Sequence, residues 1–335
     1  MTAPANVSKP RVMSGMRPTG PLHLGHLVGV LTQWETYCDT ADAFFEIADL
    51  HAYTTEFDDP VRIRDARNAM VAVWLAAGVD PQKSTIFLQS GVPEISELHV
   101  LLSMITPVSW LERVPTYKGQ IDALGQSIAT YGFLGYPLLQ LCDIAALRGE
   151  YVPVGRDQVA HLEFGREVVR RFNHLYAGGG SILIEPQPTL SDFPEVPGTD
   201  GRKMSKSYDN AILIADDEET TTKKVRSMIT DPLKVRRGDP GRPEICPLFA
   251  LWRFVNPPLL DGIAEGCRSG ALGCVADKTN FAEQLNAYLR PVRERYARFC
   301  DDPARVERII EDGTARTRAI ASAVLVDVKN AMKLI

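Results

Sequence analysis

The stretch from Val12 to His26 most constrains the fold, because it has the pattern of a short strand, a turn rich in glycine and proline, and the first turn of a helix. Pro21 suits the first helical position, since proline lacks the N–H that would have no partner there. The leucines and valine at positions 24, 27, 28 and 31 then recur at helical spacing. A helix beginning near Pro21 presents free N–H groups and the positive end of its dipole, which predicts a phosphate site.

Two histidines lie at this predicted helix start. His23 and His26 are three residues apart and therefore share one face of the helix. A single histidine in such a position is most often a cap or a surface residue. The pair beside a predicted phosphate site favours a second interpretation, in which both imidazoles contact one phosphate oxygen.

Composition limits the classes of protein that need to be considered. The 335 residues, of which 45% are hydrophobic and 24% charged, suit a globular protein of two domains. A net charge of −5 argues against a protein that coats nucleic acid such as DNA without specificity, but it allows a local basic patch. The first ten residues lack the apolar core of a secretion signal, and no apolar run approaches the ~20 residues of a membrane span. We therefore expect a cytoplasmic protein without membrane contact.

Strand and helix patterns alternate over the first half of the chain. We expect strands at 43–47, 85–89 and 151–154, and helices at 61–77, 95–105 and 157–172. Such alternation predicts a parallel sheet covered on both faces, with ligands bound at the carboxyl ends of its strands.

A loop-rich segment at 177–201 follows, and the rest of the chain has helical patterns. These helices are expected at 220–229, 247–255, 280–299 and 303–334. The predicted fold class is α/β, with a doubly wound, Rossmann-like parallel sheet in residues 1–212. A helical domain in residues 213–335 follows it, in line with usual domain sizes.

A second motif, Gly-Arg-Lys-Met-Ser-Lys-Ser at 201–207, lies in a polar loop. Alone it would be read as a solvated surface. Together with His-Leu-Gly-His at 23–26, it resembles the signature pair of class I aminoacyl-tRNA synthetases, and the wording around the first motif is most similar to the tryptophanyl branch. The resemblance extends over nearly the whole chain and includes the Gly-x-Asp-Gln element at 155–158.

The resemblance implies that an amino-acid carboxylate attacks the α-phosphate of ATP to form an acyl-adenylate. His23, His26, Lys203 and Lys206 are then the catalytic residues, because lysines on a flexible loop can neutralise the departing pyrophosphate. Mg²⁺ would bridge the ATP phosphates, with no protein ligand assigned. The residues implied to bind ATP are Arg17, Pro18, Thr19, Gly25, His26, Gly155, Arg156, Asp157, Val196, Lys203, Met204, Ser205, Lys206 and Ser207. Of these, Asp157 also suits a helix cap.

Asp143 lies in the apolar run 136–147. A carboxylate buried there needs a basic partner or a donor from a ligand. The resemblance assigns it to the indole N–H of L-tryptophan, a hydrogen bond that would reject rings without this donor. The implied tryptophan-binding residues are Gly15, His51, Gln140, Asp143, Val152, Val154 and Gln158. Gln140 and Met13 depart from the residues that are common in the family, which suggests the hypothesis of a second, inhibitor-tolerant copy of the enzyme.

Basic clusters in the helical half are the candidates for contact with tRNA(Trp), and the family usually forms homodimers. The clusters are Lys234–Arg237 with Arg242, and Arg290, Arg293, Arg295 and Arg298. Some relatives carry an iron–sulfur cluster on four cysteines. Here Cys246, Cys267 and Cys274 are followed by Asp277 in place of the fourth, so we expect no cluster.

Three alternatives remain open at this point. A tyrosyl-tRNA synthetase shares both motifs, and a phenolic hydroxyl would also suit Asp143. A nucleotidyltransferase could use the first motif without tRNA. A non-catalytic paralogue could bind tryptophan or RNA as a regulator.

Overall fold

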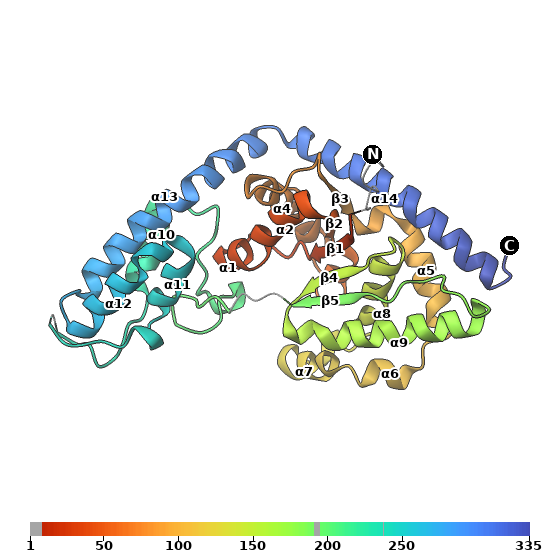
Figure 1. The fold of residues 1–335 in the computed structure, drawn as a ribbon, viewed down its shortest axis with the longest axis horizontal. Helices are drawn as coiled ribbons and strands as arrows, with labels where there is room; N and C mark the ends of the chain where they lie inside the picture. Colours follow the sequence, from red (N-terminus) through yellow and green to blue (C-terminus); the bar gives the residue numbers. More distant parts are fainter. Residues whose placement is uncertain (1–8, 191–194, 237) are drawn as a thin grey trace, which may run out of the picture.

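The computed structural model describes residues 9–190, 195–236 and 238–335. Within these ranges five parallel strands form one sheet in the order β3-β2-β1-β4-β5 (Figure 1). The strands are β1 (Arg11–Met16), β2 (Asp42–Ile47), β3 (Ser84–Leu88), β4 (Tyr151–Val154) and β5 (Gln187–Leu190). The chain runs outward from β1 to β3 and then crosses to β4, so the strand order reverses between β1 and β4. Ligands of such sheets bind at the carboxyl ends beside this switch point.

Side chains on successive strand residues enter two separate hydrophobic cores, one on each face of the sheet. Val12 and Phe45 belong to the first core, whereas Met13 and Phe44 belong to the second. This alternation follows from the two-residue period of a strand. Burial on both faces confirms the predicted Rossmann-like architecture.

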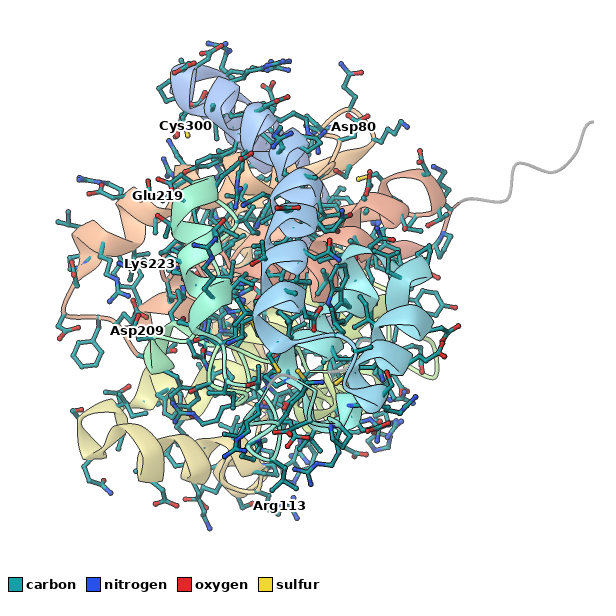
Figure 2. The ribbon with its side chains drawn as sticks, turned by 90° about the vertical axis from the view of Figure 1, so that its left-hand side faces the viewer. Asp80, Arg113, Asp209, Glu219, Lys223 and Cys300 are labelled. Carbon is teal, nitrogen blue, oxygen red and sulfur yellow. The ribbon has the colours of Figure 1, made fainter. Side chains whose placement is uncertain are left out.

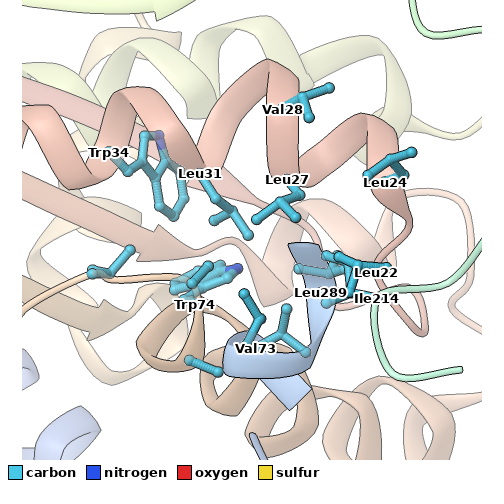
Figure 3. Close-up of a cluster of buried hydrophobic side chains, with 14 of the residues drawn as sticks. Leu22, Leu24, Leu27, Val28, Leu31, Trp34, Val73, Trp74, Ile214 and Leu289 are labelled. Carbon is cyan, nitrogen blue, oxygen red and sulfur yellow. The ribbon is translucent and has the colours of Figure 1, made fainter. Parts of the chain in front are cut away.

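Helices that follow the first motif cover the first face. They are α1 (Leu24–His26), a π-helical turn (Leu27–Leu31), α2 (Thr32–Thr40) and α4 (Pro60–Ala76). Figure 3 shows Leu27, Leu31 and Trp34 meeting Val73 and Trp74 of α4.

The prediction of a helix start near Pro21 is wrong, because α1 begins at Leu24. Residues 22–24 pair instead with a distant segment of the chain. The N–H of Leu24 donates to the carbonyl of Ile212 at 2.9 Å, and the N–H of Ile214 donates to that of Leu22 at 3.0 Å. This pairing joins the first motif to the segment just after the second motif.

The second face is covered by helices from the middle of the chain. They are α5 (Pro93–Ser103), α6 (Val108–Glu112), α8 (Tyr131–Ala145) and α9 (Val159–Tyr176). Further out, α7 (Pro115–Leu124) packs against α6, and the short α3 (Asp49–Tyr53) follows β2. The segment 177–201, expected to be a loop, contains β5. Pro188 lies within that strand, and proline is tolerated there because β5 is an edge strand.

The rest of the chain is helical, as predicted. The helices are α10 (Glu218–Ser227), α11 (Pro247–Val255), α12 (Leu260–Ser269), α13 (Cys274–Asp301) and α14 (Pro303–Ala331). Trp252, Phe281 and Leu285 are fully buried between them. Figure 2 shows the side chains of Glu219 and Lys223 projecting from α10.

The last helix returns to the sheet and runs past β3 (Figure 1). The N–H of Leu88 donates to Thr314 Oγ1 at 3.0 Å. Gly313 approaches so closely that an added Cβ would lie 1.8 Å from the carbonyl oxygen of Ile86. By its contacts α14 therefore lies with the sheet, while the division of the chain at residues 212 and 213 stays a prediction.

Candidate active site

The two motifs meet beyond the carboxyl end of β1. Lys206 Nζ donates to the carbonyl oxygen of Thr19 at 3.0 Å, which joins the second motif to the loop of the first. Gly20 has a φ of +117°, and an added Cβ there would lie 3.4 Å from Lys206 Nζ. A glycine at this position thus provides both the backbone conformation and the room for the ammonium group.

Both histidines of the first motif are neutral at pH 7. Burial, and then the nearby charge of Lys206, lower the pKa of His23 to about 4. Burial first, then the charges of His23 and Lys206, lower the pKa of His26 to about 3. Nδ1 of His26 accepts the N–H of His23 at 3.1 Å, so the proton of the neutral His26 ring is on Nε2. His26 can therefore donate a hydrogen bond to an anion without carrying a charge.

Two further cations lie near Lys206. Arg62, on α4, donates to the carbonyl oxygen of Thr19 at 3.3 Å, and Arg17 Nη1 contacts Thr55 Oγ1 at 3.4 Å. Burial lowers the pKa of Lys206; the charge of Glu56 opposes this shift, whereas those of Arg62 and Arg17 add to it. Sequence reasoning missed Arg62, which in the sequence is one of several arginines on a polar helix face.

Lys203 is arranged differently from Lys206. Its ammonium pairs with Glu195 at 3.1 Å, and its side chain is 64% exposed. The loop between them is organised by Asn210, which is 2% exposed. Asn210 Oδ1 accepts the N–H of Ser205 at 2.8 Å, and its Nδ2 donates to Asp200 at 2.7 Å. Asn210 was also missed, because an asparagine in a polar loop is unremarkable in sequence.

The remaining predicted ATP residues line the ends of β1 and β4 or the second motif. Gly155 and Arg156 are exposed where β4 ends, and Val196 and Met204 are buried and joined by a backbone hydrogen bond of 2.8 Å. Pro18 is buried in the first loop. Gly25 lies against His23, since an added Cβ would meet the imidazole at 3.0 Å. The side chains of Asp157 and Ser207 lie outside the described part of the structure.

Asp143 is held at the carboxyl ends of β2 and β3. Its side chain is 1% exposed, with Oδ2 lying 2.9 Å from His51 Nε2. Oδ1 accepts Nε2–H of Gln89 at 2.8 Å. Thus His51 and Asp143, both predicted for the tryptophan site, come together, and Gln89 joins them. Gln89 follows β3 directly, a position from which the parallel-sheet rule could have selected it.

Gln140 belongs to a neighbouring polar network around His161, which is 2% exposed. Gln140 Oε1 lies 2.9 Å from His161 Nδ1, while Thr116 Oγ1 and Tyr136 OH lie 2.5 and 2.9 Å from Nε2. With Nδ1–H donating to Gln140, the single lone pair of Nε2 accepts from the Thr116 hydroxyl, and Tyr136 OH donates to Thr116 Oγ1 at 2.8 Å.

Other predicted tryptophan residues lie in or beside the second core. Val152 and Val154 are buried there with Met13. Gln158 is half-buried in the turn after β4. Gly15 is exposed at the end of β1, on the sheet face that α8 covers.

Several of the arginines predicted to contact RNA form contacts within the protein. Arg242 pairs with Asp231 at 2.6 Å and Arg290 with Glu218 at 2.8 Å. Arg293 donates to Thr221 Oγ1 at 2.6 Å and Arg295 to the carbonyl of Ala76 at 2.5 Å. Lys234, although basic, is buried and donates to the carbonyl of Cys267 at 3.0 Å. Arg237 lies outside the described residues.

Asp277, which follows the three spaced cysteines, is also in contact with a neighbour. It is 9% exposed and accepts Nε1–H of Trp252 at 3.0 Å.

Across residues 9–190, 195–236 and 238–335, no three histidine, cysteine or acidic side chains gather as a metal-binding group. In the same part of the chain, no helix is long and apolar enough to cross a membrane.

Comparison with known proteins matches this chain to class I tRNA synthetases. The family model "tRNA synthetases class I (W and Y)" matches residues 6–290. The tryptophan–tRNA ligase of Thermotoga maritima is 43% identical over 331 residues, which cover 97% of this chain and 99% of that protein. The enzyme of Treponema pallidum is 42% identical over 334 residues, with 97% of each chain covered.

Among solved structures, tryptophanyl-tRNA synthetase from Campylobacter jejuni complexed with ADP and tryptophan superposes with a TM-score of 0.87. It is 32% identical, and the match covers 96% of this chain and 99% of that one. With both motifs joined at the carboxyl ends of a Rossmann-like sheet, this chain belongs to the class I tRNA synthetases of the tryptophan and tyrosine family.

Proposed function

We propose that this protein is a tryptophan–tRNA ligase. It activates L-tryptophan with ATP, forming tryptophanyl-adenylate and pyrophosphate, and transfers the tryptophanyl group to the 3′-terminal adenosine of tRNA(Trp). The observation that carries this proposal is the contact between Lys206 and Thr19, which brings a cation of the second motif to the loop and histidines of the first. The near full-length similarity to tryptophan–tRNA ligases supports the choice of amino acid.

In this proposal the ATP phosphates lie over the loop at 17–20. Nε2–H of His26 donates to a phosphate oxygen, and His23 lies beside it with ring centroids 3.9 Å apart. Because both rings are neutral, they stabilise the transferring phosphate by hydrogen bonds, while Lys206 and Arg62 supply the positive charge that the leaving pyrophosphate requires. Lys203 joins them by leaving the exposed pair with Glu195, which is worth little in water.

Mg²⁺ is expected to accompany the triphosphate. It would neutralise part of the phosphate charge. Since the described residues offer no carboxylate cluster at the site, we assign it no protein ligand.

Tryptophan is proposed to lie over Gly15. Val152 and Val154 would lie on one side of it, and Asp143 with its partners His51 and Gln89 on the other. Asp143 accepts the indole N–H. A tyrosine enzyme is the second candidate, because the family model covers both amino acids.

The first test is amino-acid-dependent exchange between pyrophosphate and ATP, with tryptophan and tyrosine in parallel, on the wild-type protein and on Asp143→Ala. Exchange with tryptophan only, strongly reduced in the variant, supports the proposal. Exchange with tyrosine only would overturn the substrate, and no exchange with either would favour the non-catalytic paralogue. Charging of tRNA(Trp) with tryptophan then separates a ligase from a nucleotidyltransferase that does not use tRNA.

The homodimer, the cytoplasmic location and the tRNA-binding face of the helical region stay predictions. So does the hypothesis of an inhibitor-tolerant copy, which inhibition by tryptophan analogues would test.

A further inference from the structure

A second buried carboxyl group, Glu46, lies next to the proposed tryptophan site. It is on β2, directly opposite Gly15 in the register of β1 with β2. Its side chain shares a sheet face with Phe44, two residues earlier, and points to the side that α8 covers. The residue is 3% exposed, and an added Cβ on Gly15 would lie 3.0 Å from Glu46 Oε2. Glu46 therefore lies immediately beside Gly15, which is exposed near the end of β1.

Glu46 has an unusual set of neighbours for an acid. No donor in the described part of the protein reaches its buried Oε1. Burial raises the pKa of Glu46 well above its usual range, and the charge of Asp143, a hydrogen bond with that carboxyl group and the charge of Asp49 raise it further. Two adjacent carboxyl groups away from water do not both ionise readily, which favours a protonated Glu46 beside Asp143.

The hydrogen bonds of Asp143 then form a nearly complete set. A carboxylate accepts about four hydrogen bonds. His51 occupies one position on Oδ2 and Gln89 occupies one on Oδ1. A protonated Glu46 supplies a third donor, which leaves one acceptor position for a ligand.

We propose that Glu46 is a positioning residue for tryptophan: its protonated carboxyl group donates a hydrogen bond to Asp143 and so directs the remaining acceptor position of Asp143 at the indole N–H. This inference rests on the proposed role of Asp143 as the acceptor of that N–H. Glu46 itself does not touch the reacting atoms.

The shared proton makes tryptophan binding depend on pH. Once the pair loses it at alkaline pH, two neighbouring negative charges repel each other, and Asp143 loses its third donor. The other titratable groups that face the pair are His51 and Asp49 from α3, His99 from α5 and Cys142 from α8. A variant that retains a donor at position 46 but cannot lose a proton separates the effect of Glu46 from theirs.

The test measures KM for tryptophan and kcat in pyrophosphate exchange between pH 6 and 10, with Glu46→Gln, Glu46→Leu and Asp143→Ala beside the wild type. Glu46→Gln retains an N–H donor, so we expect its KM to stay within about twofold of wild type at pH 7 and to lose the alkaline rise. Glu46→Leu is apolar and of similar size; we expect roughly a tenfold higher KM for tryptophan, with kcat and the KM for ATP unchanged. An unchanged KM for ATP and an unchanged thermal midpoint show that the variant folds.

Three outcomes overturn the inference, and they can be told apart. If Asp143→Ala leaves the KM for tryptophan unchanged, the proposed role of Asp143 fails, and the inference fails with it. If Asp143→Ala raises this KM but Glu46→Leu does not, only the role of Glu46 fails. A Glu46→Gln variant as impaired as Glu46→Leu would also refute the inference, because the donor would then be irrelevant.

Discussion

The contact between α14 and the edge of the sheet provides a sharp test of the fold through Gly313. An added methyl group on Gly313 would lie 1.8 Å from the carbonyl oxygen of Ile86, where a Cβ normally stays 3.4 Å or more from a heavy atom. The obstacle is backbone in the middle of β3, so it cannot rotate aside. We expect Gly313→Ala to force α14 away from the strand by more than an ångström.

The cost of this displacement has three parts. Overpacking a buried contact costs about 1–3 kcal/mol. The bond from the Leu88 N–H to Thr314 Oγ1, 3.0 Å long, would stretch or break, which adds about 1 kcal/mol. Alanine is the better helix former and returns about 0.5–1 kcal/mol. The net loss in the free energy of unfolding is therefore about 2 kcal/mol.

The assay is equilibrium unfolding in urea, followed by circular dichroism, with Gly262→Ala as the matched control. Gly262 lies inside α12, and an added Cβ there would meet no heavy atom within 4 Å. The same substitution should therefore stabilise the protein by about 0.5–1 kcal/mol at Gly262, by helix propensity alone. A Gly313→Ala protein as stable as wild type, or shifted in the same direction as the control, would refute the close contact between α14 and β3.

Three further predictions follow from the described contacts. His23 and His26 have pKa values of about 4 and 3 in the folded protein, against an ordinary 6.5, so the unfolded chain binds more protons below pH 6.5. The free energy of unfolding should therefore be highest above pH 6.5 and fall as the pH drops towards 4, by about 1.4 kcal/mol per pH unit for each histidine. The fall should be shallower in His26→Asn. Arg62→Gln should lower the pyrophosphate exchange rate roughly tenfold through loss of charge at the phosphates. Arg64 on the same helix is exposed and paired with Asp65, so Arg64→Gln should keep the wild-type exchange rate. Equal rates for the two variants would exclude Arg62 from the site. Trp252→Phe removes the donor to buried Asp277 and should cost about 1–3 kcal/mol in urea unfolding, and no loss would mean that Asp277 does not depend on this bond.

The sheet could be predicted because its signals are local. Each central strand is a short apolar run followed by a helix with clear end signals, such as Gly78 after α4, which has a φ of +112°. The strand β5 lacked such a signal, since Pro188 within it suggests a loop. The start of α1 depended on a partner nearly 190 residues away, at Ile212, which no local pattern reveals.

At the candidate site, too, local sequence signals could be recognised, whereas contacts between distant segments could not. The motifs predicted His23, His26 and Lys206 as site residues, and their catalytic roles stay predictions. Arg62 and Asn210 contact these motifs from other segments, and the sequence around each one is ordinary. Glu46 is visible in the sequence as an acid that interrupts the apolar run 43–47. Its position beside Gly15, however, follows only from the register of β1 with β2.

The hydrogen bond from Lys206 to the carbonyl of Thr19 has a consequence for turnover. A lysine that points into bulk water must shed its hydration shell before it can bind a phosphate, whereas Lys206 already has a protein oxygen in that place. In the proposed role of Lys206, binding of ATP exchanges one oxygen for another and spares part of the dehydration cost. When pyrophosphate departs, the carbonyl of Thr19 would take the ammonium group back, which would lower the cost of breaking the contact with the product and favour its release.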